Sequence, residues 1–499
     1  MGPRTEQTDQ KQQDLDALIK ECEDALEELM RDSDASDDFE TYERKLLELV
    51  HEIARRKLEK KLQTMSEGLA ARLAIDRAND WANWREDTAF QYRRHCPGTV
   101  TYHSLVGPLR VCRYTYRERG STATCVPLEL AAGLMERMTP SLARCVAIGY
   151  AHMPLRTCEE MLIAGGLRPP SRSTLDRAAR DVGAYAVACN EVLEPQLRAN
   201  EWTPPSTRLI AIGLDRVAVP MRHGEEREGF AVYCGPVRRD RPKPKPRTLL
   251  RGPVQWRMDY VGTVAFFDEE KRLLASRKYR VPGEADIAMI VNHVMADVRH
   301  ALVQRPVGVA VIQDGAPELW SALETALKNE PTVREWTAVL DWYHLDERLT
   351  KCLELCVESG GRDSQRARWH ALLLEREHGA DGVIRALRKK ARIAQADVSA
   401  QLTTHVRYIE HNKHRMNYCA YRAQSLPIGS GVTEGACKSV VNVRAKRSGQ
   451  RWSQRGLSAA LHLRTIHESD RFDSFWSFFA RRYRAAHIVP LGFESARAN

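Results

Sequence analysis

The stretch VGVAVIQDGAPELW, from Val307 to Trp320, decides how the rest of the chain is interpreted. It opens with small and branched apolar residues, a pattern typical of a buried strand, and then leads through Gln313 into Asp314. An amphipathic stretch follows behind Pro317, and proline is a normal first residue of a helix. Because burying an unpaired carboxylate is costly, Asp314 is either an ordinary turn residue or a ligand of a bound cation.

Two further acids stand beside comparable patterns. Asp215 lies within the apolar run RLIAIGLDRVAVPM, and Glu434 lies in the first turn of the helix predicted after GSGVT. Neighbouring strands lie about 4.8 Å apart, so acids at adjacent strand ends can converge. Three carboxylates at one edge of a sheet would suit two Mg²⁺ ions that clamp a phosphodiester. Alternatively, Asp215 is a turn acid, and Glu434 favours the positive end of its helix and forms a surface pair with Lys438.

The region around these acids predicts a mixed α/β fold. An apolar strand is followed by a hairpin that turns at Asp268–Lys271 and by the amphipathic stretch EADIAMIVNHVMADVRHAL. Beyond Val307–Trp320, the stretch EWTAVLDWYHLDERL contains another strand, which ends at Asp341. The resulting order β-β-β-α-β-α-β indicates helices packed against one sheet. Residues 351–425 are then predicted to be mostly helical.

The N-terminal part of the chain combines helices with short strands. Residues 9–92 carry apolar residues at helical spacing, which favours a helical pair or a dimerising arm. From about 93 to 135 the alternation of apolar and polar residues predicts strands. A zinc ribbon needs two close cysteine pairs, which are missing here, so small buried thiols are favoured over a metal site at Cys96, Cys112 and Cys125.

Residues 136–200 are predicted to be helical again. A first helix around Thr157–Ala164 is followed by a Gly-Gly turn, a Pro-Pro break and a second helix over Thr174–Val182. This pattern indicates a helix-turn-helix that binds DNA, although a plain αα-corner fits the same residues equally well. The side chains available to phosphates or a groove are Arg172, Arg177 and Arg180.

Composition points to a polyanionic partner and a reducing compartment. The 499 residues carry a formal net charge of +10, with a pI near 9.0, and nucleic acid is the commonest partner of such chains. The polar N-terminus does not resemble a signal peptide, and no apolar run approaches the roughly 20 residues that span a bilayer. Twelve cysteines without a repeated spacing favour free thiols. We therefore expect a cytoplasmic protein that is not inserted in a membrane.

Four stretches of the sequence are informative through the identity of their residues as well as through the spacing of their acids. GLDRVAVPM, IQDGAPELW, LDWYHLDERL and GSGVTEGACKSVVNVRAKRSGQRWS together resemble the transposases of ISKra-type insertion sequences. That family resembles the DDE transposases, which implies an RNase H-like catalytic core with a helical insertion. The resemblance makes Asp215, Asp314 and Glu434 the catalytic acids and the ligands of two Mg²⁺, or Mn²⁺, ions. Asp341 and His344 match the family's DWYH stretch, where they would support the ligands, contact DNA or serve as ligands themselves.

The chain departs from that family at two places. Members of the family carry paired cysteines in the region 93–135, and because those pairs are missing here we do not expect zinc. Arg216 follows the first acid where small or hydroxylated residues are more usual.

Basic residues follow Glu434 without an intervening acid. On a helix that starts at the metal site, these residues would contact the phosphates of the DNA backbone. Such contacts position DNA without reading its sequence. Trp452 either stacks on an unpaired base at the transposon end or packs in the core under a basic face. The Arg/Lys/Pro stretch 238–251 is a second candidate for phosphate contact. The basic residues in question are Lys438, Arg444, Lys446, Arg447, Arg451 and Arg455.

These observations predict a multidomain α/β protein that acts as a bacterial insertion-sequence transposase and assembles as a homo-oligomer on transposon-end and target DNA. A catalytically silent DNA-binding derivative and an RNase H-like nuclease are the alternatives. The expected parts are a helical N-terminal region (1–92), a degenerate zinc-ribbon-like β-element (93–135), a helix-turn-helix (136–200), a first part of the catalytic core (201–350), a helical insertion (351–425), and the last part of the core with C-terminal helices (426–499).

Overall fold

The computed structural model describes residues 17, 20–21, 24–28, 31, 38–78, 92–118, 124–222, 254–283 and 286–488. Most of the first predicted N-terminal helix and the whole basic stretch 238–251 lie outside these residues. The chain divides into two compact units. The first comprises Met1–Ala186, Gly229–Lys243 and Trp476–Asn499, and the second comprises Val187–Glu228 and Pro244–Phe475.

The first unit pairs a long helix with a small sheet. Helix α2 (Phe39–Ala78) lies along the antiparallel strands β1 (Tyr92–Ser104), β2 (Gly107–Glu118) and β3 (Thr124–Cys125), and a short helix α3 (Pro127–Ala131) follows. Polar side chains of α2 bind the main chain of β2: Gln63 accepts from the Cys112 NH at 2.9 Å, and Ser66 donates to the Cys112 carbonyl. The strands predicted between 93 and 135 are therefore present, and α2 covers them.

The predicted helical pair follows in the same unit. Helices α4 (Pro140–His152), α5 (Leu155–Ala164) and α6 (Arg172–Ala188) succeed one another, and Gly166 ends the turn after α5 with a φ of +75°. Helix α6 begins two residues earlier and ends later than the sequence predicted. The C-terminal helix α18 (Phe472–Ile488) contributes aromatic rings to the unit, with Tyr185 and Phe479 edge to face at 5.6 Å.

The second unit is built on a mixed five-stranded sheet in the order β6-β5-β4-β7-β8. Strand β4 (Leu209–Met221) pairs antiparallel with β5 (Gln255–Phe267), and β5 pairs antiparallel with β6 (Leu273–Val281). Strand β7 (Gly308–Gln313) pairs parallel with β4, and β8 (Thr337–Leu340) pairs parallel with β7. The predicted mixed α/β class and the predicted order of elements are confirmed, including the hairpin turn after Phe267.

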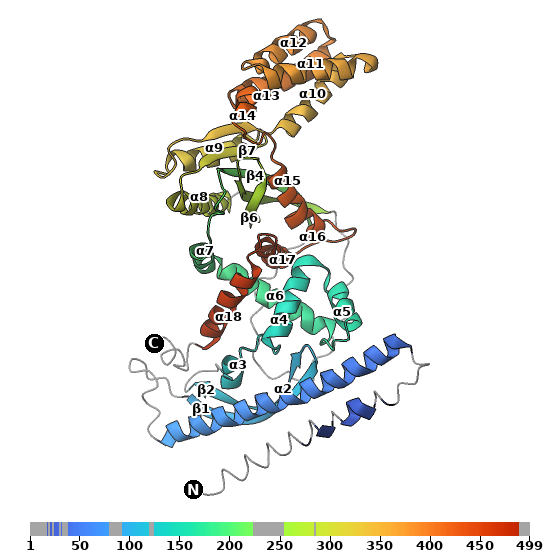
Figure 1. Cartoon of the computed structure of the whole chain (residues 1–499), viewed down its shortest axis with the longest axis vertical. Coiled ribbons are helices and arrows are strands. Elements are labelled where there is room, and N and C mark those ends of the chain that lie inside the picture. Colours follow the sequence, from blue (N-terminus) through green and yellow to red (C-terminus); the bar gives the residue numbers. More distant parts are fainter. Residues whose placement is uncertain are drawn as a thin grey trace. The chain divides into compact units, whose positions relative to one another are not determined.

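Helices cover both faces of this sheet because β4 alternates its side chains between two layers. Ile210, Ile212 and Leu214 pack with α8 (Ile287–Gln304) and α9 (Pro317–Lys328). Leu209 and Ala211 face the helical layer that follows β8. The helices of that layer gather beyond one end of the sheet (Figure 1) and are α10 (Trp342–Cys356), α11 (Arg362–Glu375), α12 (Gly379–Ile393), α13 (Ala396–Asn412) and α14 (Tyr418–Ala423).

Shorter elements complete the second unit. Helix α7 (Asn190–Ala199) precedes the sheet, and after the helical layer the chain returns through α15 (Gly431–Ala436), a π-helical stretch (Cys437–Asn442), α16 (Val443–Ala445) and α17 (Gln454–His467). In the part of the chain that the structure describes, no helix is both long and apolar enough to cross a membrane. The described cysteines are free thiols, as predicted, and Cys352 and Cys356 are packed one helical turn apart without pairing.

Candidate metal centre

Three acids lie just beyond the parallel pairing of β4, β7 and β8. Asp314 and Asp341 follow the last residues of β7 and β8, whereas Asp215 lies within β4, where it pairs with Val261 of β5. Ile212 and Val311 form the last pair between β4 and β7, and Asp215 and Asp314 each lie three residues further along the chain. Next to them, the main-chain NH of Asp341 donates to the carbonyl of Gln313 at 2.9 Å, directly after the last pair between β7 and β8. The parallel register therefore brings Asp215, Asp314 and Asp341 to one edge of the sheet.

Helix α15 brings a fourth acid to the same edge. The Thr433 hydroxyl lies 2.7 Å from the Thr263 hydroxyl of β5, and a Cβ on Gly213 would lie only 2.6 Å from the Thr433 hydroxyl. The helix can approach β4 this closely because residue 213 has no side chain. Glu434 follows Thr433 directly, so the glycine contact fixes its backbone beside the strand that carries Asp215.

Asp341, His344 and Glu434 form the tightest cluster. Asp341 is fully buried and begins α10, where its carboxylate accepts hydrogen bonds from the main-chain NH of His344 at 2.7 Å and from Nδ1 of the same imidazole at 3.1 Å. The Ser430 NH donates to its other oxygen. Nδ1 of His344 also lies 3.7 Å from the Glu434 carboxylate. One ligand atom from each of these three residues lies within 4.8 Å of the others, a spacing that suits a metal ion.

Electrostatics keep this cluster charged. Burial would raise the pKa of Asp341, but hydrogen bonds from His344 and from the Ser430 NH outweigh it, and the net shift is downward. The hydrogen bond to Asp341 raises the pKa of His344 to about 9 despite partial burial, and Asp314 and Glu434 add to the effect. With no metal ion bound, His344 is therefore cationic at neutral pH, and an ion that took its imidazole as a ligand would displace that proton.

Asp215 has a different environment. Its carboxylate accepts hydrogen bonds from the Cys437 thiol at 3.2 Å and from the Arg216 NH at 2.6 Å. Burial raises its pKa, and the nearby Asp314 charge raises it further. The Arg216 guanidinium turns away and pairs with Glu318 of α9. The first acid is thus packed against a neutral thiol instead of an arginine.

The turn that carries Asp314 is held from two sides. Its carboxylate accepts a hydrogen bond from the Ala316 NH at 3.0 Å, and the indole of Trp320 donates to its main-chain carbonyl. On the other side Tyr408 of α13 packs so closely that any Cβ on Gly315 would overlap the phenol ring. Glycine therefore follows Asp314 because the helical layer lies against this turn.

The four acids outnumber the cations beside them. His344 and Lys438 lie against the cluster, the latter with its ammonium 3.3 Å from Glu434, whereas Arg216 is engaged by Glu318. An excess of carboxylate oxygens with partial exposure is the donor set that Mg²⁺ and Mn²⁺ prefer. The residues present fit such an ion, with Asp341, Glu434, Asp215 and Asp314 as oxygen donors.

The basic residues after Glu434 fall into two groups. Lys438 is 70% exposed, and Lys446 and Arg447 are also exposed, so they remain candidates for phosphate contact, as does the partly buried Arg451. Arg444 and Trp452 are in the interior, 2% and 7% exposed, with the guanidinium 4.6 Å from the indole centroid.

The burial of Trp452 has a local cause. Its NH donates to the Pro220 carbonyl, its carbonyl accepts from the Arg222 NH, and its indole donates to the Ala445 carbonyl at 3.2 Å. Trp452 thereby forms a parallel bridge with Met221 at the end of β4. Of the two interpretations of Trp452, the structure favours the packed core residue, and the expectation that Arg444 contacts DNA is not compatible with its burial.

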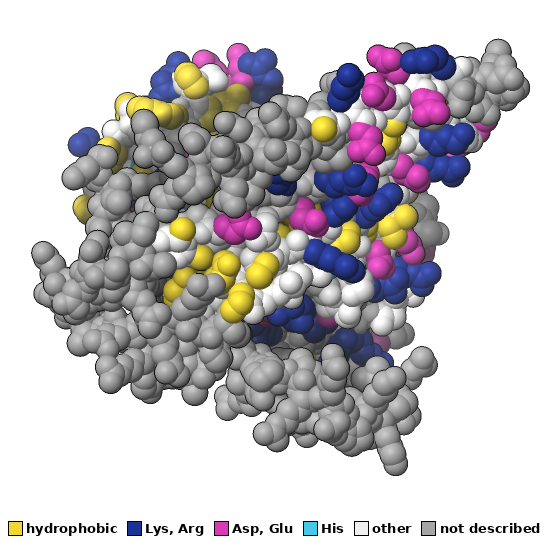
Figure 2. All heavy atoms as spheres, turned by 90° about the horizontal axis from the view of Figure 1, so that it is seen from below, with side chains coloured by type: hydrophobic (Ala, Val, Ile, Leu, Met, Phe, Trp, Pro, Cys, Tyr) yellow, Lys and Arg dark blue, Asp and Glu magenta, His cyan; other side chains and the backbone are white. Residues whose placement is uncertain are grey.

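The arginines of α6 lie on the surface. Arg172 pairs with Glu159 of α5 at 2.7 Å, Arg180 pairs with Asp176 at 2.6 Å, and Arg177 is exposed. On the face drawn in Figure 2, basic and acidic side chains lie interspersed and do not form a single basic area. In the predicted zinc-ribbon region, Cys112 is a free thiol, and the side chains of Cys96 and Cys125 lie outside the described residues.

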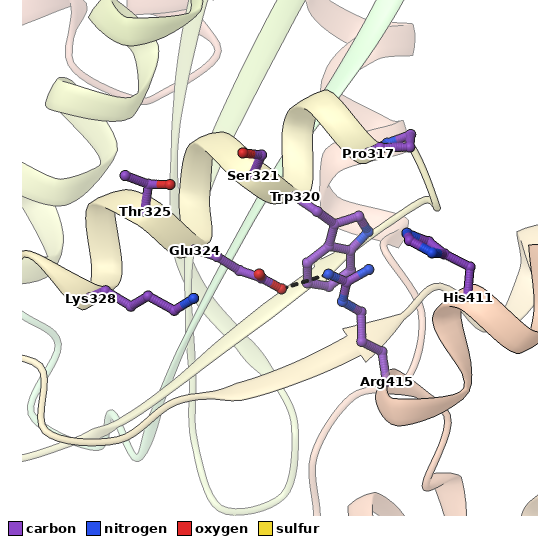
Figure 3. Close-up of a pocket in the computed structure, with 8 residues that line it drawn as sticks. All are labelled: Pro317, Trp320, Ser321, Glu324, Thr325, Lys328, His411 and Arg415. Carbon is purple, nitrogen blue, oxygen red and sulfur yellow. Dashed lines mark hydrogen bonds and ion pairs between the residues drawn. The ribbon is translucent and has the colours of Figure 1, made fainter.

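A small cavity of about 210 Å³ lies behind the Asp314 turn, on the outer side of α9. Arg415 reaches across the indole of Trp320, 3.9 Å from its centroid, to pair with Glu324 (Figure 3). His411 and Lys328 complete the polar lining. This contact fastens α9 to the helical layer and thereby supports the turn that carries Asp314.

Sequence reasoning left Asp341 and His344 as supporting residues, DNA contacts or ligands, and the structure places them with Glu434. The signal was available, because TAVLD repeats the pattern of a strand followed by an acid seen in VIQD. Cys437 was not singled out. Nothing in one sequence shows that a thiol one turn after Glu434 will face Asp215, because that contact joins residues far apart in the chain.

Comparisons with known proteins add little. No protein-family model and no curated protein matches the chain. A solved structure, the Drosophila P element transposase strand transfer complex, matches 68% of this chain and 80% of its own, with 11% identity and a TM-score of 0.25. A TM-score this low carries no argument about fold or function, so the site itself must carry the assignment.

Proposed function

We propose that this chain is a DNA transposase of a bacterial insertion sequence. It would bind terminal inverted repeats, hydrolyse a phosphodiester bond at the element end in a metal-dependent reaction, and transfer the freed 3′-hydroxyl to target DNA. The observation that carries the proposal is the excess of carboxylates at the carboxyl edge of the mixed sheet, with Asp215, Asp314, Asp341 and Glu434 gathered from four elements.

Support for an RNase H-like core comes from the order of the elements. An antiparallel β4-β5-β6 unit is followed by two parallel strands on the other side of β4, and helices cover both faces. The helical layer between β8 and α15 corresponds to the predicted insertion. Ligands of open α/β sheets bind at the carboxyl ends of parallel strands, where these acids lie.

The acids would hold divalent cations, and such ions supply a nucleophilic hydroxide and neutralise the charge of a phosphodiester when bound. Asp215, Asp314 and Glu434 are the ligands that the sequence resemblance indicates, and Asp341 lies close enough to join them or to orient His344. The His344 cation would offset part of the phosphate charge, because its raised pKa keeps it protonated at neutral pH. Lys438, exposed next to Glu434, would hold the neighbouring phosphate.

DNA outside the catalytic centre would be held by residues that the structure leaves on the surface. Lys446, Arg447 and Arg451 follow the catalytic helix, and the α6 arginines Arg172, Arg177 and Arg180 would contact the terminal repeats if α5 and α6 act as a helix-turn-helix. The N-terminal helices would join copies of the chain in a homo-oligomer. A DNA-processing protein of this kind would act in the cytoplasm, at the nucleoid.

The decisive experiment is an in vitro reaction on labelled duplexes that carry the inverted repeats flanking the gene, with Mg²⁺ and a target plasmid. The wild-type chain is expected to cleave the end and join it to the target, whereas Asp314→Asn should bind the end without cleaving it. Cleavage without joining would identify a nuclease instead. Binding without cleavage by the wild type would identify a catalytically silent derivative, and either result would overturn the proposal.

A further inference from the structure

One large apolar side chain of the site faces solvent. Tyr343 lies in the first turn of α10, between Asp341 and His344, and is 62% exposed. In the stretch 304–392, which the structure describes throughout, it is the one large apolar side chain that is exposed. Single exposed apolar residues are common on protein surfaces, so its position between two residues of the cluster is what requires an explanation.

The ring of Tyr343 is held in place by the segment that precedes α15. The Trp342 NH donates to the Ile428 carbonyl at 2.9 Å, so the first turn of α10 and this segment are joined by their main chains. A Cβ on Gly429 would lie 2.7 Å from the Tyr343 ring and 3.8 Å from the Asp341 carboxylate. One edge of the ring therefore rests on the glycine main chain, and the ring and the carboxylate approach the same point.

We propose that Tyr343 is the platform on which one base of the DNA strand stacks beside the phosphate that divalent cations held by the carboxylate cluster would bind. The proposal rests on the proposed function, because it assumes a nucleic-acid strand at this site. A base lies one sugar away from its phosphate, so an exposed ring next to a phosphate-binding cluster is placed to receive it. Aromatic stacking tolerates any base, since every base has a π-face.

The alternative platform, Trp452, is not available for this role. Its indole is buried and donates to the Ala445 carbonyl, whereas the Tyr343 ring is open to solvent. Lys438, exposed on the chain that follows Glu434, offers a cation for the backbone of the same strand. A stacking ring and a cation beside a carboxylate cluster suit a strand of nucleic acid better than an acidic peptide, which carries no planar base next to each negative charge.

The test measures the coupling between this ring and a base. The full-length chain, with Mg²⁺ present, is titrated with labelled strands of about six thymidine nucleotides, which carry no element end, and with base-free sugar-phosphate strands of the same length. Wild type is expected to prefer the strand with bases on the order of 10-fold. Tyr343→Ala should lose that preference while binding the base-free strand as wild type does, and Tyr343→Phe should keep the preference.

A matched control is Trp202→Ala. Trp202 is an exposed aromatic of the same unit (83% exposed) that lies before the start of β4, at the opposite end of that strand from its junction with Trp452, and its removal should leave the preference unchanged. An undiminished preference in Tyr343→Ala, or no preference in wild type, would overturn the inference. If the protein cleaves DNA but its preference for bases does not depend on Tyr343, only the stacking role is refuted. If the preference depends on Tyr343 but the protein does not cleave DNA, only the transposase assignment is refuted.

Discussion

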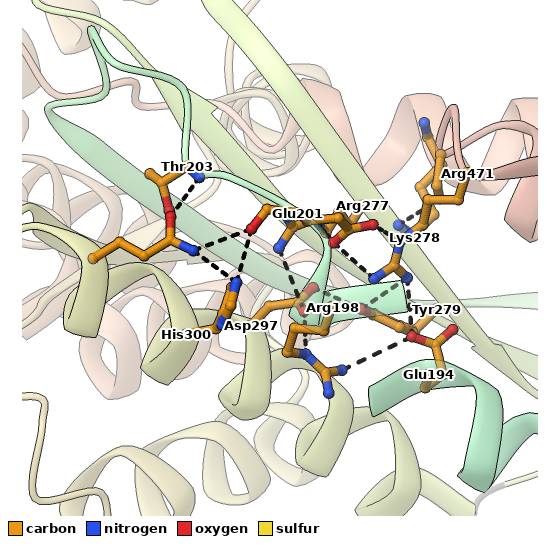
Figure 4. Close-up of polar contacts among 12 residues, drawn as sticks. Glu194, Arg198, Glu201, Thr203, Arg277, Lys278, Tyr279, Asp297, His300 and Arg471 are labelled. Carbon is orange, nitrogen blue, oxygen red and sulfur yellow. Dashed lines mark hydrogen bonds and ion pairs between the residues drawn. The ribbon is translucent and has the colours of Figure 1, made fainter. Parts of the chain in front are cut away.

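Two groups of acids in the second unit, buried or partly buried, differ in how their charge is compensated. The first group comes from α7, α8 and the segment between α7 and β4, and its acids pair with the guanidinium groups of three arginines (Figure 4). These acids are Glu194, Glu201 and Asp297. In the second, the carboxyl edge of the sheet, four acids meet one imidazolium and one exposed lysine. We call the first group the arginine network; its three arginines are Arg198, Arg277 and Arg471.

The arginine network shows what compensation by the chain itself does. Asp297 is fully buried, and burial would raise its pKa, but Arg277, Arg471 and Arg198 outweigh it and the pKa is lowered. Its carboxylate accepts from Arg198 Nε and from the Tyr279 hydroxyl, both at 2.6 Å. Buried charge is stable here because every acid has a cation within hydrogen-bonding distance.

Asp215 shows the opposite balance. It too is largely enclosed, but its partners are a thiol and a main-chain NH, and its pKa is raised by burial. Three arginines lie around Asp297, whereas no arginine side chain among the described residues pairs with the Asp215 carboxylate. Burial also raises the pKa of Glu194 beside two arginines, so the two groups differ in their partners. The Asp215 carboxylate accepts from a thiol and a main-chain NH, and a bound divalent cation would supply the positive charge there.

The largest effect is expected from removing a charge at the carboxyl edge. Asp215→Asn should reduce DNA cleavage on the order of 10³-fold, because a donor of the metal centre is lost, while the free energy of unfolding stays equal or rises. End-cleavage kinetics and denaturant unfolding measure the two quantities. The control Asp363→Asn changes an exposed acid of α11 and should leave both unchanged. A large loss of stability in Asp215→Asn would show that the acid is structural.

The next effect concerns the arginine network. Arg471→Met should lower the free energy of unfolding by about 3–5 kcal/mol, because Glu194 and Glu201 would lose the guanidinium they share and keep only Arg198 at 3.8 Å and Arg277 at 2.9 Å. The matched change Arg272→Met removes an arginine that is 72% exposed, and it should cost less than about 1 kcal/mol. Urea unfolding compares the two variants. Equal losses of unfolding free energy in the two variants would show that the ion pairs of the arginine network stabilise the fold no more than an exposed pair does.

A smaller effect is expected where the helical layer meets the Asp314 turn. Gly315→Ala should destabilise the chain by about 1–3 kcal/mol and lower cleavage, because its Cβ would overlap the Tyr408 ring. Adding Tyr408→Ala should restore part of the activity. Gly435→Ala, in α15 with nothing near the added methyl group, should be neutral or stabilising by up to about 1 kcal/mol. If both alanine variants behave alike, the turn is not positioned by Tyr408.

The smallest effect is a pH dependence of the arginine network. Burial, and then Arg198, lower the pKa of His293 to about 4, against 6.5 for an ordinary histidine. The unfolded chain therefore takes up a proton as pH falls below about 6.5 while the folded chain does not, so stability is full above that pH and is lost toward pH 4. By about pH 6 the loss should be near 1 kcal/mol. His293→Gln should flatten this slope in unfolding experiments, and an unchanged slope would assign it to other groups.

The fold was predictable where the signal is local. Patterns of only a few residues predicted three elements that are all present: the strand Leu209–Met221, the hairpin turn and the strand before Asp314. The order of strands in the sheet was not predictable, because it depends on pairing between residues about 100 positions apart, such as Ile212 with Val311.

The site was predictable to the same extent. Apolar runs that contain or end in an acid identified Asp215 and Asp314, and the same rule applied to Asp341 would have given it more weight. The burial of Trp452 could not be predicted, since it depends on an added bridge to the end of β4. The approach of α15 through Gly213 is likewise a contact between distant segments, which a single sequence does not reveal.

The central claim is that the carboxyl edge of the sheet is short of positive charge and binds a divalent cation. Mn²⁺ binding to the full-length chain, followed by electron paramagnetic resonance at neutral pH, tests it without DNA or turnover. The account predicts saturable binding by wild type and by Glu270→Gln, an exposed acid at the hairpin turn, and binding at least about 10-fold weaker in Glu434→Gln. Equal binding by all three proteins, or none by wild type, would contradict it.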